Sequence, residues 1–263
     1  MPDFSTMKTG RIYSPTLASG TRRFGVTASA ALSGINVAPE IDWYSKIQNW
    51  PMYGNDHLAD CTCAAVGHAI QQWTSYSKPS PILVTDSDVI QFYEIVSGYN
   101  PSQPLSDRGA VCFTVLQQWK SGGVPISGVP STVPNSVKDT LFSFKSINWN
   151  NEHEFKSTIT VFANVYLGLN MPLSAQTQEI WSPVEGPNGA PGSWGGHLVL
   201  VVGYNKDHYI VVTWGRLMAM TYDFLAKYGE EAYALVNTDF LNTNSLTPSG
   251  LSWQTLQDYE AVV

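Results

Sequence analysis

The chain has 263 residues and a formal net charge of −7, which is long enough for one large domain or two small lobes around a core. Its acidity argues against sequence-independent binding of nucleic acid, and three cysteines are too few for a disulfide framework or a four-cysteine zinc site. No apolar run reaches the roughly 18 to 20 residues of a membrane helix, and the N-terminus lacks the apolar segment of a secretory signal. We therefore expect no bound metal, no membrane partner and synthesis in the cytoplasm, with delivery as part of a particle left open.

The first 38 residues differ in charge from the rest of the chain. They carry a formal charge of +3, whereas the other 225 residues carry −10. The charged residues of this region are Asp3, Lys8, Arg11, Arg22 and Arg23. Because the region has no sustained periodicity, residues 1–38 are predicted to form an N-terminal extension that lies on the body of the protein or on an assembly partner. Residues 39–263 are left for the folded domain.

Helical patterns fill the first half of the folded domain. Small or apolar residues recur at helical offsets over 61–73, 86–97 and 110–120. Asp60 is available as the N-cap of the first of these helices. A further capped helix is predicted where Asn150 precedes Glu154.

The second half changes to strand patterns. Residues 163–170, 197–204 and 208–214 are apolar, and rich in β-branched or alternating side chains, which predicts strands. A loop rich in glycine and proline, 183–196, leads into the second of these strands. Residues 220–228 suggest one more helix.

Cys61 and His197 are the candidate reactive pair. A nucleophilic thiol needs a base and a positive electrostatic environment, and the unpaired amides at a helix N-terminus supply part of that environment. Cys61 lies where the first helix should begin, and His197 starts a strand in the other half of the chain. A Cys–His dyad is therefore the first hypothesis for this chain.

Three segments resemble the papain-like cysteine peptidase family (clan CA), in the manner of a divergent bacterial or phage-type member. The segment IDWYSKIQNWPMYGNDHLADCTCAAVGHAI is similar to the region that leads into the family's nucleophile. Downstream, GGHLVLVVGYNKDHYIVVTWG is similar to its histidine strand and the strand that follows. Between them, DRGAVCFTVLQQWKSGGV resembles its Gly-Gly segment and the next helix, so the resemblance covers Ile41 to Val236.

The resemblance implies an α+β fold with two lobes and a cleft between them. The helical lobe would span about 40–130 and the β-rich, barrel-like lobe about 131–263. It also implies a peptidase or related amide hydrolase that works through an acyl-enzyme without a cofactor. The substrate would then be a peptide or protein, cell-wall peptide included.

The resemblance also implies a role for each matching residue. Cys61 would be the nucleophile and His197 the general base, with Asn55 as the side chain that stabilises the oxyanion. Trp214 matches the indole that shields the histidine from water. The residues that match positions which hold substrate are Gly109, Ala110 and Gly196.

Two departures from the family pattern bear on activity. The family's orienting asparagine falls at Val212 or, if the strand is one residue shorter, at Thr213, and neither side chain can replace it unchanged. Asp60 places a carboxylate directly before Cys61, which would raise the pKa of the thiol.

The other histidines and cysteines have ordinary structural interpretations. His68 is two helical turns from Cys61, too far for a dyad, and is expected to pack in the core, while His57 remains open as an auxiliary base. Cys63 and Cys112 are expected to be small buried apolar residues.

A second class of function stays open beside the enzyme. The missing asparagine, Asp60, a charged content of only 13% and the basic extension also suit a weak or inactive papain-like scaffold. Such a scaffold would act as a binding or structural component of a phage-like assembly. An acyltransferase that uses the same acyl-enzyme is a minor third alternative.

Overall fold

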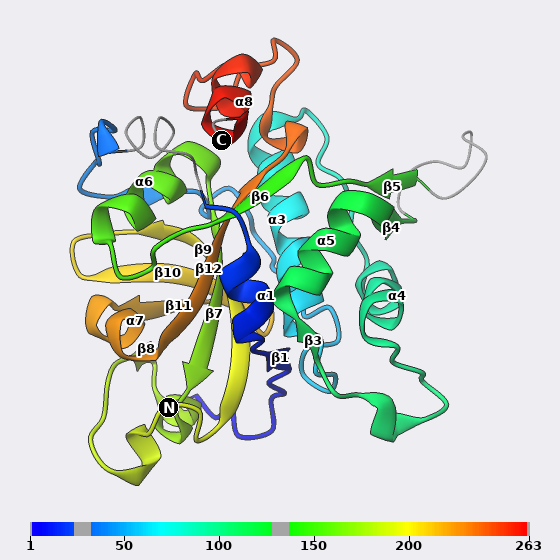
Figure 1. Ribbon diagram of the computed structural model, residues 1–263, viewed down its shortest axis with the longest axis vertical. Helices are drawn as coiled ribbons and strands as arrows, with labels where there is room; N and C mark the ends of the chain where they lie inside the picture. The colour runs from blue at the N-terminus through cyan, green and yellow to red at the C-terminus, as the bar shows by residue number, and fades with distance from the viewer. Residues whose placement is uncertain (1, 24–32, 128–136, 262–263) are drawn as a thin grey trace.

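A computed structural model describes residues 2–23, 33–127 and 137–261 of the chain, and an eight-stranded sheet runs through its centre (Figure 1). Seven strands follow one another across the sheet: β6 (Ser143–Ser146), β12 (Gly229–Val236), β7 (Val165–Met171), β9 (Gly195–Tyr204), β10 (His208–Thr213), β11 (Arg216–Thr221) and β8 (Ile180–Trp181). The eighth, β2 (Ile41–Asp42), pairs with the C-terminal end of β9. Within this sheet, as far as its residues are described, β8 and β11 are the one parallel pair and the other neighbours are antiparallel.

The three predicted strands are the central ones, β7, β9 and β10. The first begins at Val165 because Ala163 adopts a left-handed backbone, with φ of 70°, that ends the preceding helix. The second begins at Gly195 rather than His197, because the end of the glycine-rich loop already pairs with Met171. The sheet therefore extends two residues further into this loop than the apolar pattern alone indicates.

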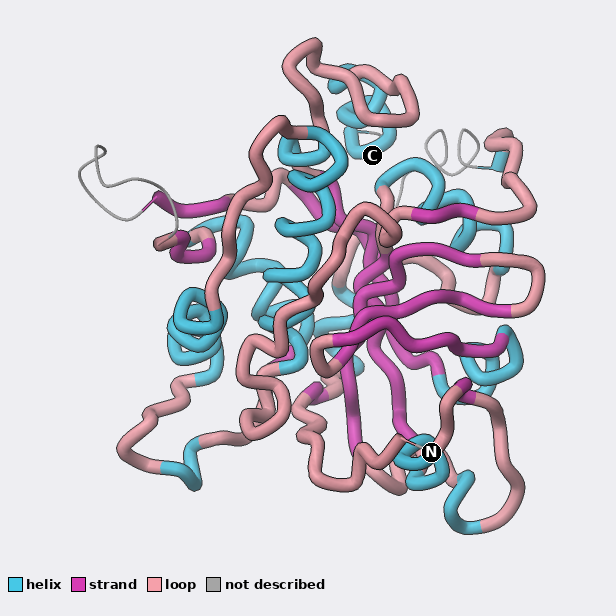
Figure 2. Tube along the Cα trace, turned by 180° about the vertical axis from the view of Figure 1, so that it is seen from behind, coloured by secondary structure: helices cyan, strands magenta, loops and turns pink. Residues whose placement is uncertain are grey.

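Both faces of the sheet are buried, which is why its central strands are almost wholly apolar. Side chains alternate between two core clusters: Leu167 and Val199 belong to one, and Tyr166 and Leu198 to the other. Figure 2 shows the strands from behind with helices on either side. The central strands thus connect both halves of the core.

Three helices lie on one side of the sheet, and two helices pack against the other face (Figure 1). The first group is α3 (Cys61–Ser77), α4 (Asp86–Ser97) and α5 (Cys112–Gly122). In this group, α4 packs on α3 and α5 rather than on the sheet itself. The second group is α6 (Glu152–Phe162) and α7 (Tyr222–Tyr228). All five correspond to helices predicted from the sequence, which together with the sheet gives the predicted α+β class.

Several helix ends differ from the sequence-based expectation: α3 runs to Ser77 rather than to Trp73, and α5 spans Cys112–Gly122 rather than 110–120. The N-cap of α6 is Asn151 rather than Asn150, and its side chain accepts a hydrogen bond from the Glu154 amide. Helix α7 starts at Tyr222 because Met220 still belongs to β11. At α3, Asp60 precedes the helix but makes no capping hydrogen bond through its side chain.

The remaining elements are short. They are α1 (Pro15–Gly20), β3 (Ala110–Val111), β4 (Val124–Ile126), β5 (Val137–Asp139), α8 (Trp253–Ala261) and four 3₁₀ turns at Pro104–Ser106, Leu173–Thr177, Pro187–Gly189 and Thr238–Phe240. Within the described residues, no helix is long and apolar enough to cross a membrane.

The start of the chain lies on the body of the protein. Its strand β1 (Arg11–Ile12) pairs in parallel with β3, between the helices of one side and the sheet (Figure 1). Phe4 joins the core cluster that lies under α6 and α7. We call residues 2–14 the arm. The rest of the predicted extension includes residues 24–32, which lie outside the described part of the chain.

Candidate active site

Cys61 is the first residue of α3, and its thiol is buried. Burial raises the pKa of Cys61 to about 12, and the charge of Asp60 adds to the rise, against hydrogen bonds from the backbone of Leu198 and Gly10. The thiol is therefore neutral in this arrangement. Asp60 is itself buried, and burial raises the pKa of its carboxyl well above the usual value.

His197 lies in β9 opposite Leu169 of β7. Its Nε2 is 2.6 Å from Oγ1 of Thr213, and its Nδ1 has no hydrogen-bond partner among the described residues. Burial, and then the charge of Arg11, lowers the pKa of His197 to about 3. A neutral ring with one nitrogen fixed and the other free is the form that a general base requires.

The packing of α3 on β9 brings the two residues to neighbouring parts of the fold. Leu198 follows His197 in β9, and Leu198 and Cys61 belong to the same core cluster. The structure thus places Cys61 beside the segment that carries His197.

Thr213, not Val212, faces the histidine. The sequence left Val212 and Thr213 as alternatives for the orienting position. The hydrogen bond to His197 comes from Thr213, whereas the side chain of Val212 is buried in the core cluster that contains Cys61. A hydroxyl oxygen can accept a hydrogen bond from Nε2–H as the amide oxygen of an asparagine would. Thr213 is therefore the residue of the two that contacts the ring of His197.

Trp214 covers the imidazole. The two rings stack with centroids 4.3 Å apart and planes 16° apart, and Phe4 of the arm stacks on the same indole at 5.3 Å. Trp214 has a left-handed backbone, with φ of 45°, at the turn between β10 and β11. Its Nε1 donates a hydrogen bond to the carbonyl of Lys8, so the arm fixes the indole as well.

Asn55 is buried near the start of α3. Its Nδ2 donates to the carbonyl of Leu58 at 3.3 Å, and its amide lies close enough to Asp60 to oppose part of the rise in that carboxyl's pKa. In this arrangement the amide is engaged with its own loop. A role at an oxyanion requires its second N–H to point at the substrate.

The arm fills the space between Cys61 and the neighbouring strands. The carbonyl of Gly10 accepts a hydrogen bond from the Ala110 amide at 2.9 Å. A Cβ at Gly109 would lie 1.9 Å from that same carbonyl oxygen, and one at Gly196 would lie 2.3 Å from the carbonyl oxygen of Arg11. The three residues predicted to hold substrate are thus the ones against which the arm lies.

Arg11 anchors the arm. Its guanidinium pairs with the carboxylates of Glu230 and Glu231 and donates to the carbonyl of Leu169. The side chain of Arg11 is only 1% exposed. The sequence analysis missed this cluster. The available signal was an adjacent pair of glutamates in a chain with few charges.

The remaining candidates lie apart from this centre. Nε2 of His68 is 2.8 Å from the carbonyl of Pro51 in the core, as expected for a packing histidine. His57 is exposed and pairs with Asp56, so its ring is not at the buried thiol. Cys63 and Cys112 are both buried.

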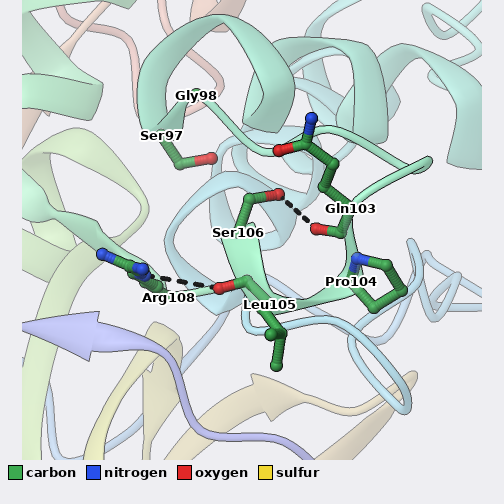
Figure 3. A pocket seen from close by; sticks show the side chains of 7 residues that line it. All are labelled: Ser97, Gly98, Gln103, Pro104, Leu105, Ser106 and Arg108. Atoms are coloured by element: carbon green, nitrogen blue, oxygen red, sulfur yellow. Dashed lines mark hydrogen bonds between the residues drawn. The ribbon is translucent and has the colours of Figure 1, made fainter.

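An open hollow lies on the surface beyond α4. Residues Ser97, Gly98, 103–106 and Arg108 line it, and Figure 3 shows the hydrogen bond from Arg108 to the Leu105 carbonyl across it. Neither Cys61 nor His197 contributes to this lining. The hollow is therefore separate from the buried pair.

No protein-family model matches the chain, and no curated protein sequence matches it either. Solved structures do. Xylellain, a cysteine protease from Xylella fastidiosa, aligns with a TM-score of 0.63 at 15% identity, over 89% of this chain and 97% of its own. Procathepsin B S9 from Trypanosoma congolense aligns with a TM-score of 0.62 at 12% identity, over 89% of each chain. The chain has the two-lobe α+β fold of the papain-like cysteine proteases.

Proposed function

We propose that the chain is a papain-like cysteine peptidase or related amide hydrolase whose reactive pair is Cys61 and His197. The observation that carries the proposal is the state of the histidine. Its Nε2 is 2.6 Å from Oγ1 of Thr213, its Nδ1 has no hydrogen-bond partner among the described residues, and the next residue of its strand belongs to the same core cluster as Cys61. A buried histidine with only a structural role is expected to have both ring nitrogens hydrogen-bonded.

The reaction follows from these positions. Nδ1 of His197 takes the proton of the Cys61 thiol, and the sulfur attacks the carbonyl carbon of the substrate. The backbone N–H of Cys61 and the amide of Asn55 donate to the oxyanion. His197 returns its proton to the leaving amine, which leaves a thioester on Cys61. Water, deprotonated by His197, then hydrolyses this thioester and restores the thiol.

The described arrangement is the closed form of such an enzyme. The pKa of Cys61 is about 12 and that of His197 about 3, so neither group is ionised near neutral pH. The carbonyl of Gly10 is held by the Ala110 amide, which keeps it in the strand pairing of the arm. Release of the arm would admit water and substrate and remove the Arg11 charge from the ring.

Hydrolysis by the full chain carrying Gly10→Ala tests the proposal. The new Cβ would lie 1.9 Å from the carbonyl oxygen of Ala59, so the arm can no longer occupy its place. We expect cleavage of a denatured protein substrate, read by mass spectrometry, and no cleavage when Cys61→Ser is added. A folded Gly10→Ala chain that cleaves no peptide or amide would refute the proposal and favour the binding-scaffold alternative.

A further inference from the structure

Glu230 and Glu231 form the base of a pocket that the arm fills with one side chain. Nη1 of Arg11 donates to Glu231 at 2.7 Å, and Nη2 donates to Glu230 and to the carbonyl of Leu169. The side chain of Glu231 is 5% exposed and that of Glu230 is 22% exposed. The pocket thus satisfies a cation with three acceptors, two of them charged.

Other side chains hold the two carboxylates in place. The hydroxyl of Tyr233 donates to the second oxygen of Glu231 at 2.6 Å, and Nδ2 of Asn170 donates to the second oxygen of Glu230 at 3.2 Å. These donors come from strands β12 and β7 and do not belong to the arm. The acceptors therefore stay oriented when Arg11 leaves, which is what a preorganised binding pocket requires.

Gly168 makes the room for a long side chain. A Cβ at Gly168 would lie 2.8 Å from Cδ of Arg11 and 2.8 Å from Cγ of Glu231. The absence of a side chain at this position of β7 creates the channel along which the Arg11 stem runs. The pocket is thus shaped for a long unbranched side chain with a positive end.

The pocket lies beside the reactive pair. Arg11 donates to the carbonyl of Leu169, which lies opposite His197 in the pairing of β7 and β9. The carbonyl of Arg11 lies against Gly196, the residue before His197. A side chain bound here therefore belongs to a residue whose backbone lies beside the segment that carries His197.

We infer that this pocket receives an arginine or lysine side chain of the incoming peptide, and that the arm occupies it with Arg11 as a stand-in. The inference rests on the proposed function, because it names the substrate class of the same site. One buried and one partly exposed carboxylate left without a cation are costly, so a peptide with a basic side chain replaces the arm at least cost. A neutral side chain leaves both carboxylates unpaired.

The contacts also rank the basic side chains. Nε of Arg11 has no hydrogen-bond partner, so the acceptors serve only the far end of the guanidinium. Lysine can reach those acceptors as a point charge but lacks the fork that contacts both carboxylates. We therefore expect the order arginine, then lysine, then the neutral glutamine and leucine.

Binding of short labelled peptides tests the pocket without any need for catalysis. The full chain carrying Arg11→Ala and Cys61→Ser is titrated with blocked peptides that differ only at one central residue, Arg, Lys, Gln or Leu, with flanks unlike the arm. Fluorescence anisotropy should show the arginine peptide binding at least about tenfold more tightly than the leucine peptide. Adding Glu231→Gln should abolish most of that ratio, whereas Glu185→Gln, at an exposed glutamate, should not.

Two results of the binding experiment would overturn the inference. Equal binding of the arginine and leucine peptides, or no binding by any of them, means that the pocket does not read a basic side chain. Mapped cleavage sites then separate the two proposals. Selective binding without cleavage by the Gly10→Ala chain refutes the proposed function alone. If the chain cleaves peptides but the residue adjacent to the cleavage position is not enriched in arginine or lysine, the inference about the pocket is refuted and the proposed function stands.

Discussion

At the scale of single residues, the site depends on one hydrogen bond that holds the imidazole. The productive tautomer of His197 carries its proton on Nε2, because Nδ1 must accept the proton of Cys61. Oγ1 of Thr213 is 2.6 Å from Nε2, where it can accept that proton, and Trp214 stacks on the ring. In the proposed mechanism Thr213 therefore holds the orientation of the ring and serves its productive tautomer as the acceptor.

Replacing Thr213 by valine should lower kcat of the arm-released Gly10→Ala chain. The valine has the same shape but leaves Nε2–H unpaired in a buried place, which costs about 1 to 3 kcal/mol, or roughly 5- to 160-fold in rate. Thr213→Ser, which keeps the hydroxyl, should retain most of the rate. Steady-state kinetics would contradict the assignment if valine and serine gave the same kcat.

At the scale of elements, the arm and the glycine-rich approach to β9 decide whether the site is open. The arm is held by the pairing of β1 with β3, by Phe4 and Lys8 on Trp214, and by the ion pairs of Arg11. Most of these contacts involve backbone groups of the arm or the ring of Trp214. The ion pairs of Arg11 are the contacts that one side-chain substitution removes completely.

Arg11→Ala should loosen the arm while the body stays folded. The substitution leaves two carboxylates unpaired, and breaking a buried pair in this way costs on the order of 3 to 5 kcal/mol. Hydrogen exchange followed by mass spectrometry should show faster exchange of residues 2–14 and of the Ala110 amide, which donates to Gly10. Arg22→Ala, at an exposed arginine of the same region, should leave that exchange unchanged.

Local signals predicted the helices well, and long-range pairings explain what was missed. Helix α4 has the predicted bounds because its capping box at Thr85 and the left-handed Gly98 are encoded by neighbouring residues. The choice between Val212 and Thr213 depended on a register shift between β9 and β10 at Ile210 and Val211, which no periodicity reveals.

The position of the arm could not be predicted from its own residues, because its partners lie far away in the sequence. Its anchor Arg11 and the carboxylate of Glu231 are 220 positions apart in the chain. Composition shows only that the region is basic, and the partners of a charge depend on the tertiary fold. The predictions for Cys61, His197 and Trp214 could be made because motif positions carried them, while their roles remain proposals.

At the scale of the whole molecule, burial of two histidines links stability to pH. Burial lowers the pKa of His68 to about 4 and that of His197 to about 3, while both titrate near 6.5 in the unfolded chain. At these two positions the unfolded state binds more protons than the folded state below about pH 6.5. These two histidines therefore lower the free energy of unfolding as the pH falls through this range, whereas Asp60 and Asp239, whose carboxyl pKa values burial raises, act in the opposite direction.

Urea unfolding at pH values from about 7 down to about 4, in the native chain and in His68→Gln, isolates the contribution of His68. We expect His68 to account for a loss of about 3 kcal/mol over this range, since each unit of pKa shift corresponds to about 1.4 kcal/mol. His68→Gln keeps a donor for the Pro51 carbonyl but does not titrate, so its stability should fall less steeply over the same range. Equal slopes for the two proteins would show that His68 is not the linked group.

The central claim is that Cys61 and His197 form a working nucleophile and base that the arm keeps closed. The most direct measurement is the rate of iodoacetamide labelling at Cys61, by peptide mapping from about pH 4 to about pH 9, in the native, Gly10→Ala and Gly10→Ala/His197→Ala chains. We expect slow labelling of the native chain and fast labelling of Gly10→Ala well below the free-thiol pKa of about 8.5. The acid-side reactivity should disappear with His197→Ala. A Gly10→Ala chain whose thiol titrates near 8.5 with or without His197 would contradict the claim.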